Sequence, residues 1–177
     1  MVTTLLTTHH VGGRAGTRTF PSMKYFEKDL VNVLYEADES SISGIKKETH
    51  YLPSKTIILP DCLSGSAGKR KFYIYNNRYF SSLYPLKPEQ TGAYSFDSQF
   101  GWDTDPKALS IVETLTLDTV TLDEVVKREK SENIPSPDFL SLDTQGSELE
   151  ILKGGEIAIG NTVVAIATEV SFTQIYE

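Results

Sequence analysis

Near its C-terminal end the chain places an acidic residue directly after a short apolar run. Residues 139–142 are typical of a short buried strand, and Asp143 stands at the end of that run. A glycine turn and the start of a helix follow at once, with Gln145 and Glu148 close behind Asp143. Ligands of open α/β sheets bind at the carboxyl ends of the strands. These three residues are therefore candidates for ligand binding or acid–base chemistry.

Glycines at the end of the first predicted strand indicate a second part of the same site. Gly12, Gly13 and Gly16 could let the backbone approach a ligand closely and turn its N–H groups toward it. Glu36 comes 20 residues after Gly16, at the end of the next predicted strand, where a carboxylate can accept hydrogen bonds from both ribose hydroxyls. The combination favours a nucleoside-containing ligand. Glu36 is preferred to Asp38, which is better placed to cap the following helix.

His9 and His10 lie next to the glycine turn, but a metal site is not expected there. Adjacent residues of a strand point to opposite faces of the sheet, so the two imidazoles make poor co-ligands. One of them could face the ligand pocket and form a hydrogen bond or accept a proton.

The alternation of apolar runs, turns and helical patterns predicts an α/β fold, with a mainly parallel sheet covered by helices on both faces. A helix is expected over residues 40–47, and two capping-box patterns, Thr121 with Glu124 and Ser147 with Glu150, predict further helix starts. The continuous apolar run 162–167 is typical of a strand in the centre of a parallel sheet. Strands are expected over residues 5–11, 31–35, 56–59, 71–75, 113–120, 139–142 and 162–167.

Length and composition favour one domain over residues 1–177, with an ordinary core. The formal net charge of −7 argues against nucleic acid as a partner, because phosphate backbones are bound by basic surfaces. The single cysteine, Cys62, excludes an intramolecular disulfide and a multi-cysteine zinc site. We expect no membrane span, since no run approaches the roughly 20 apolar residues needed, and the cytoplasm is the default compartment.

Taken together, these segments resemble the FkbM family of S-adenosylmethionine-dependent methyltransferases. Residues 139–154 resemble the family's strand, D-x-[EQ]-G-x-E motif and helix, and residues 34–37 stand where the family has a Phe-Glu-Pro-like strand end. Residues 68–72 and 81–83 resemble its hairpin and Ser-Ser-Leu loop, while residues 121–123 and 169–176 complete the order. His10 departs from the family, which has an acidic residue before the glycine turn.

The resemblance implies a Rossmann-like methyltransferase fold, S-adenosylmethionine as cofactor, and O-methylation of a sugar or secondary metabolite. A small molecule or glycan is then the expected acceptor. The expected catalytic base is Asp143, with Glu169 or His10 as fallbacks. Glu148 could orient the acceptor or favour the positive end of its helix. The implied cofactor-binding residues are Gly12, Gly13, Gly16, Glu36 and Asp61, and the implied substrate-binding residues are Ser81, Ser82, Gln145 and Glu148.

Two other functions remain open at this stage. A strand, a glycine turn and an acidic residue also serve NAD, so an oxidoreductase is an alternative, although the chain lacks the G-x-G-x-x-G order. The second alternative is a degenerate domain that binds S-adenosylmethionine but has lost catalysis. Because the family's fold normally ends in an antiparallel hairpin, we expect that hairpin to be missing from a truncated chain. The last strand should then expose an edge through which the chain self-associates.

Overall fold

The computed structural model describes residues 5–12, 21–50, 55–88, 107–130, 134–172 and 174–177. Its main sheet has five strands in the order β3-β2-β1-β7-β8, and all neighbouring strands are parallel. The β-branched and aliphatic runs of the sequence form these strands. Their bounds are β1 Leu6–Val11, β2 Leu30–Tyr35, β3 Lys55–Leu59, β7 Phe139–Leu142 and β8 Ala165–Thr168.

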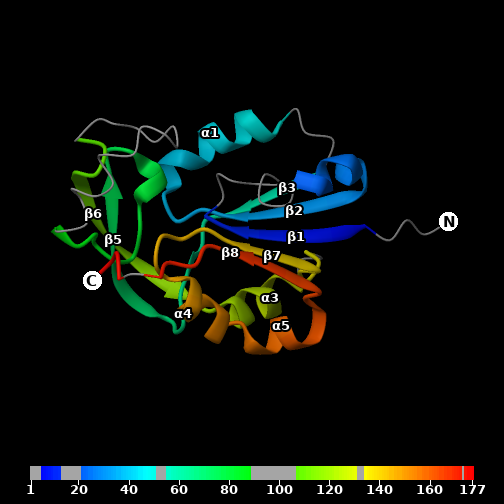
Figure 1. Cartoon of the computed structure of the whole chain (residues 1–177). Coiled ribbons are helices and arrows are strands. Elements are labelled where there is room, and N and C mark those ends of the chain that lie inside the picture. The colour runs from blue at the N-terminus through cyan, green and yellow to red at the C-terminus, as the bar shows by residue number, and fades with distance from the viewer. Residues whose placement is uncertain (1–4, 13–20, 51–54, 89–106, 131–133, 173) are drawn as a thin grey trace.

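Helices cover both faces of this sheet. In Figure 1, α1 (Glu39–Thr49) lies on one side, and α3 (Leu122–Lys130), α4 (Glu148–Lys153) and α5 (Glu156–Thr162) lie on the other. The chain moves outward from β1 to β3 in one direction and from β7 to β8 in the other. Right-handed crossovers in opposite directions bring their helices to opposite faces. The predicted α/β, Rossmann-like architecture is confirmed.

The main core lies between the sheet and α3, α4 and α5. Val33, Leu140, Leu122 and Ile151 have no exposed surface, so strands and helices are joined by closely packed aliphatic side chains. The described residues also form two 3-10 helices, η2 (Pro21–Asp29) and η3 (Arg78–Phe80).

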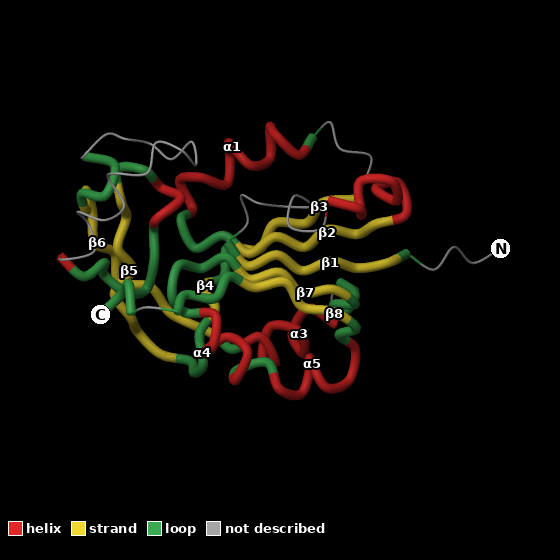
Figure 2. The backbone as a smooth tube through the Cα atoms, viewed as in Figure 1, coloured by secondary structure: helices red, strands yellow, loops and turns green. Residues whose placement is uncertain are grey.

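A second, smaller sheet lies beyond the carboxyl ends of the main strands (Figure 2). It contains β4 (Cys62–Leu63), β5 (Gly68–Tyr75) and β6 (Ile111–Val120) in the order β4-β6-β5. β5 and β6 are antiparallel, and the side chains of β6 are mostly exposed or half-buried, as expected for a sheet with one face toward solvent. The second sheet thus lies across the carboxyl ends of the main-sheet strands.

One of the two predicted capping boxes is confirmed and the other is wrong. The Glu124 carboxylate accepts the Thr121 backbone N–H at 2.9 Å, and the Thr121 hydroxyl accepts the Glu124 N–H at 3.1 Å. Ser147 makes no side-chain cap bond, since its hydroxyl donates to the Thr144 hydroxyl at 2.9 Å, and the Glu150 carboxylate binds Arg70 and not the Ser147 backbone. Asp38 caps α1 as expected, accepting the Ser40 N–H at 3.1 Å.

The prediction of a central strand over residues 162–167 is wrong in both the bounds of the strand and its position in the sheet. Thr162 ends α5, and β8 begins at Ala165 and pairs with β7 at the end of the strand order, not in the centre of the sheet. Val164 is 79% exposed, so the apolar run does not mark a strand buried on both faces. Within the described residues, no helix is long and apolar enough to cross a membrane.

Candidate functional site

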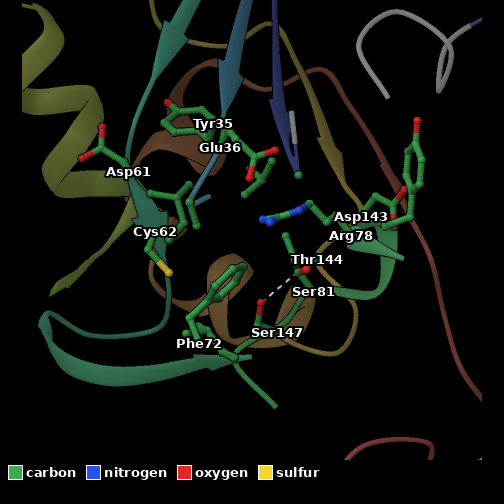
Figure 3. A pocket seen from close by; sticks show the side chains of 16 residues that line it. Tyr35, Glu36, Asp61, Cys62, Phe72, Arg78, Ser81, Asp143, Thr144 and Ser147 are labelled. Atoms are coloured by element: carbon green, nitrogen blue, oxygen red, sulfur yellow. Dashed lines mark hydrogen bonds between the residues drawn. The ribbon is translucent and has the colours of Figure 1, made fainter. Parts of the chain in front are cut away.

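The candidate site is a cleft at the carboxyl edge of the main sheet, where the strand order reverses between β1 and β7. Clefts at such switch points are the usual ligand sites of open α/β sheets. Figure 3 shows side chains from the strand ends, β5 and the η3 loop converging on it. The lining residues are Val11, Gly12, Tyr35, Glu36, Ala37, Asp61, Cys62, Leu63, Phe72, Arg78, Tyr79, Ser81, Leu83, Asp143, Thr144 and Ser147.

Gly12 brings the ends of the neighbouring strands β1 and β7 together. Its φ of +87° lies in the left-handed region, and a Cβ at this position would stand 2.1 Å from the Asp143 carbonyl oxygen. Asp143 in turn donates its N–H to the Val11 carbonyl oxygen at 3.0 Å. Only glycine permits this close approach. Gly13 and Gly16, predicted to bind the cofactor, lie outside the described residues.

Glu36 stands at the end of β2 and faces the cleft (Figure 3). It is 6% exposed, and its N–H donates to the Leu59 carbonyl oxygen at 3.0 Å, which fixes the backbone beside β3. One carboxylate oxygen accepts the Asp38 N–H at 2.8 Å. A carboxylate held in this way is suited to accept hydrogen bonds from ligand hydroxyls.

Arg78 is the main lining residue that the sequence did not indicate. It comes from η3, and its guanidinium donates to the Asp38 carboxylate at 2.5 Å and to the Ser40 hydroxyl at 3.1 Å. Burial alone would raise the pKa of Asp38, but hydrogen bonds from Ser40, Ser41 and Arg78 outweigh it and lower the pKa. No local pattern could have revealed Arg78, because its partner lies 40 residues earlier in the chain.

Asp61 and Cys62 line the cleft beside β3. The Asp61 carboxylate is bound by both terminal nitrogens of Arg128, at 2.6 and 3.1 Å, so it fastens α3 to this edge of the sheet. This ion pair competes with the cofactor-binding role expected for Asp61. Burial raises the pKa of the Cys62 thiol to about 12, so this cysteine is an unreactive part of the wall.

Asp143 belongs to a cluster of polar side chains at the end of β7. The side-chain amide of Gln145 donates to the Asp143 carboxylate at 2.7 Å and to the Glu169 carboxylate at 3.4 Å. Although Asp143 reaches solvent, the surrounding protein removes enough water to raise its pKa, and the charge of Glu148 adds to the rise. Burial, together with the charges of Asp143 and Glu148, also raises the pKa of Glu169. The two carboxylates therefore interact and share one donor.

Glu148 fastens the turn between Asp143 and α4. Its carboxylate accepts the N–H groups of Thr144 and Gly146, at 2.8 and 2.9 Å. The sequence had suggested that Glu148 orients the acceptor or interacts with the positive end of its helix, but not that it holds this turn. Its predicted contact with the acceptor stays untested.

A second cavity adjoins this turn on the side of β8 and the C-terminal residues. Its walls include Gln145, Glu148, Glu169 and Tyr176. The predicted site residues are thus divided between two cavities. Gly12, Glu36, Asp61, Ser81 and Asp143 line the first cleft, while Gln145, Glu148 and Glu169 line the second cavity.

His10 and Ser82 line neither cavity. His10 is 1% exposed in the middle of the sheet, and burial, with a smaller effect of His9, lowers its pKa to about 3. A pKa this low makes His10 a weak base, and its side chain does not line the cleft, so it gains no support as the catalytic base. Ser82 is buried, and its hydroxyl donates to the Gln145 carbonyl oxygen at 2.6 Å, so it supports the loop from behind.

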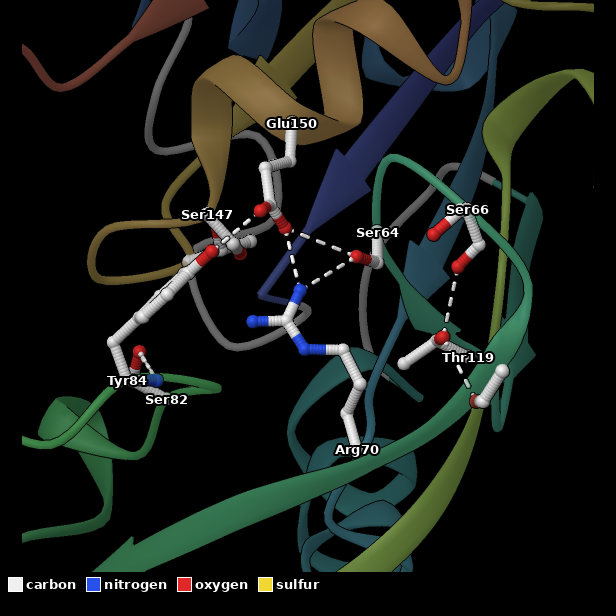
Figure 4. A network of polar contacts seen from close by, with 10 residues as sticks. Ser64, Ser66, Arg70, Ser82, Tyr84, Thr119, Ser147 and Glu150 are labelled. Carbon is white, nitrogen blue, oxygen red and sulfur yellow. Dashed lines mark hydrogen bonds and ion pairs between the residues drawn. The ribbon is translucent and has the colours of Figure 1, made fainter.

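A network around Glu150 fixes the second sheet to α4 (Figure 4). Arg70 of β5 donates to the Glu150 carboxylate at 2.6 Å and to the Ser64 hydroxyl at 3.0 Å. The Tyr84 hydroxyl donates to the other carboxylate oxygen of Glu150, and the Arg70 guanidinium lies 4.9 Å from the centre of the Tyr84 ring. These contacts hold β5, which carries part of the outer wall of the cleft, against α4.

Comparison with known proteins gives one finding that bears on this site. A protein-family model described as the methyltransferase FkbM domain matches residues 10–177. The matched region includes the ends of β1 and β7, between which the cleft lies. No curated protein and no solved structure matches the chain.

Proposed function

Because the chain belongs to the FkbM methyltransferase family, we propose that it transfers a methyl group from S-adenosylmethionine to a hydroxyl oxygen of a sugar or secondary metabolite. The family match confirms the resemblance found in the sequence. The observation that carries the finer proposal is the meeting of Gly12, Glu36 and Asp143 at one cleft, where the strand order reverses. The cytoplasm remains the proposed compartment.

The residues of the cleft suit such a cofactor. Glu36 would hold the ribose hydroxyls, and Gly12 would leave room for the backbone to approach the amino-acid portion. Glu36 and Asp143 also put negative charge in the cleft, and Asp38 already balances the guanidinium of Arg78. That balance favours a positively charged sulfonium. Gly13 and Gly16 remain predicted contacts.

The protein's part in the chemistry is to position the groups and to accept a proton. S-adenosylmethionine, when bound, supplies a methyl carbon activated by its sulfonium, and the electrons of the broken carbon–sulfur bond stay on sulfur. Asp143 would orient the acceptor hydroxyl and take its proton as the oxygen forms its new bond to carbon. Glu169 is the second candidate for this role.

The acceptor would approach from the second cavity and from the loop that carries Ser81. Gln145, Glu148 and Ser81 could hydrogen-bond to the several hydroxyls of a small molecule or glycan. The carboxylates Glu148 and Glu169 disfavour an acceptor that carries negative charge near this end. With a net charge of −7, the protein is not proposed to bind nucleic acid.

Calorimetry with S-adenosylmethionine and, separately, with NAD tests the cofactor. Binding of S-adenosylmethionine without binding of NAD is the expected result, and the reverse would replace the proposal with an oxidoreductase. Transfer of radiolabelled methyl to a set of monosaccharides and their glycosides then tests turnover. Tight cofactor binding with no transfer to any hydroxyl acceptor would favour a binding domain that has lost catalysis.

A further inference from the structure

Gln145 occupies an unusual place between the two cavities. Its φ is +59°, which only a few per cent of non-glycine residues adopt, and Gly146 follows with a φ of +113°. Such backbone conformations persist where the surroundings hold them, and they gather at functional sites. The strained residue stands two positions after Asp143, the proposed base.

The surrounding structure fixes the Gln145 backbone from two sides. The Ser82 hydroxyl donates to the Gln145 carbonyl oxygen at 2.6 Å, and the Glu148 carboxylate holds the N–H groups on either side of Gln145. Tyr176 packs against the next residue so closely that a Cβ on Gly146 would stand 2.8 Å from its ring. This turn is therefore held by the nearby Glu148 and by two residues that are distant in the sequence, Ser82 and Tyr176.

The side chain of Gln145 is fixed as well, and its orientation is decided by its partners. Tyr176 donates its hydroxyl to the amide oxygen at 2.6 Å. The amide nitrogen must then face Asp143 and Glu169, to which it donates at 2.7 and 3.4 Å. An amide held at its oxygen end presents its donors to the two carboxylates without having to reorient.

We propose that Gln145 is a positioning residue that spans Asp143 and Glu169 and holds the Asp143 carboxylate toward the acceptor hydroxyl. The inference rests on the proposed methyl transfer, since Asp143 receives the proton in that reaction. Because Asp143 lines the first cleft while Gln145 and Glu169 line the second cavity, this bridge lies where cofactor and acceptor would meet.

The ionisation of Asp143 offers a direct readout of this role. The titratable groups near Asp143 include Glu148 in α4, Glu169 after β8, Tyr176, and, lining the first cleft, Tyr35, Glu36, Asp61, Cys62, Arg78 and Tyr79. Burial and Glu148 raise the pKa of Asp143, whereas the hydrogen bond from Gln145 lowers it. Loss of that donor should therefore move the titration of Asp143 to higher pH.

The test compares wild type with Gln145→Met, which keeps the length of the side chain but removes the donors. Carbon-13 NMR of labelled Asp and Glu carboxyl groups, without cofactor, should show the titration of Asp143 displaced upward by about 0.5–1 pH unit. The acid limb of methyl transfer should move by the same amount, with little change in the KM for S-adenosylmethionine. An unchanged titration in folded Gln145→Met, or a shifted titration without a shifted acid limb, overturns the proposal.

Tyr176→Phe removes only the hydroxyl that holds the Gln145 amide, so it keeps the test valid if Gln145→Met fails to fold. It should shift the Asp143 titration in the same direction by a smaller amount, and no shift would count against the proposal. Tyr84→Phe is the matched control, because it removes a tyrosine hydroxyl that donates to Glu150 instead. It should leave the Asp143 titration in place. Failure of wild type to bind S-adenosylmethionine in calorimetry would refute the proposed function separately.

Discussion

Glu36 and Asp143 have different neighbours, and these decide what each carboxylate can do. Glu36 is almost fully buried and fixed beside β3, whereas Asp143 reaches solvent and shares a donor with Glu169. The first arrangement suits binding of a neutral hydroxyl, and the second suits exchange of a proton with an acceptor.

Replacing Glu36 by alanine should weaken binding of S-adenosylmethionine. Loss of charge-assisted hydrogen bonds to the ribose is expected to cost about 1.5–3 kcal/mol, or roughly ten- to hundred-fold in affinity. Calorimetry measures the change. Glu39→Ala is the matched control, since Glu39 is exposed in the first turn of α1 and does not line the cleft. Equal affinity of the two variants would falsify the ribose assignment.

Replacing Asp143 by asparagine should slow methyl transfer and leave the cofactor largely bound. The amide cannot accept the hydroxyl proton, so turnover is expected to fall by roughly 10²–10⁴-fold. Turnover and the Kd for S-adenosylmethionine, both measured on the same preparation, separate the two effects. Near wild-type turnover would transfer the role of base to Glu169.

At the scale of elements, the sequence predicts structure well where partners are close along the chain. The capping box of Thr121 and Glu124 spans three residues and forms as predicted. Glu150 has the same spacing from Ser147 but finds Arg70, 80 residues earlier, which is a stronger partner for a carboxylate than a backbone N–H. Arg78 was not predicted, because its partner Asp38 is also distant in the sequence.

The site residues follow the same division. The predicted strand ends put four residues at one edge of the sheet, because the carboxyl ends of parallel strands meet there, and in the structure these residues line one cleft: Gly12, Glu36, Asp61 and Asp143. The allocation of Gln145, Glu148 and Glu169 to a second cavity depends on how the residues after β8 pack. No periodicity in the sequence encodes that packing.

Replacing Glu150 by alanine should loosen the second sheet from α4. Burial alone would raise the pKa of Glu150, but hydrogen bonds from Tyr84, Arg70 and Ser64 lower it. A lowered pKa means that the ionised carboxylate stabilises the fold above its ordinary pKa of about 4.5, and that this stability is lost as pH falls below that value. Allowing for partial exposure, we expect a loss of about 1–2 kcal/mol at pH 7.

Urea unfolding of Glu150→Ala and wild type at several pH values measures this effect. The difference between the two proteins should be greatest at neutral pH and should shrink below about pH 4. Glu113→Ala, on the exposed part of β6, is the control and should change little. A difference that does not depend on pH would mean that the Glu150 carboxylate stabilises the fold through packing and not through its charge.

At the scale of the whole molecule, β8 forms one end of the main sheet. It pairs with β7, and no other described strand joins its far side. Val164, Val170 and Phe172 nearby are 79%, 63% and 98% exposed. A strand edge beside exposed apolar side chains is a template for pairing with another chain.

We therefore propose that two copies of this chain associate through β8. Light scattering should show a mass that increases with protein concentration, and Ile166→Lys should reduce it by placing a charge at the edge. Lys153→Ala, outside β8, is the control. A concentration-independent monomer would mean that the edge is not used.

The contact between Gly12 and Asp143 also bears on how the protein acquires activity during folding. The end of β1, proposed to face the cofactor, and the end of β7, which carries the proposed base, touch through backbone atoms alone, without any adjustable side chain between them. Pairing of β1 with β7 therefore sets the distance between these two parts of the cleft in the same step that closes the centre of the sheet. A chain in which these strands have not yet paired would lack the proposed catalytic cleft altogether, so recovery of activity during refolding is expected to report directly on completion of the central sheet.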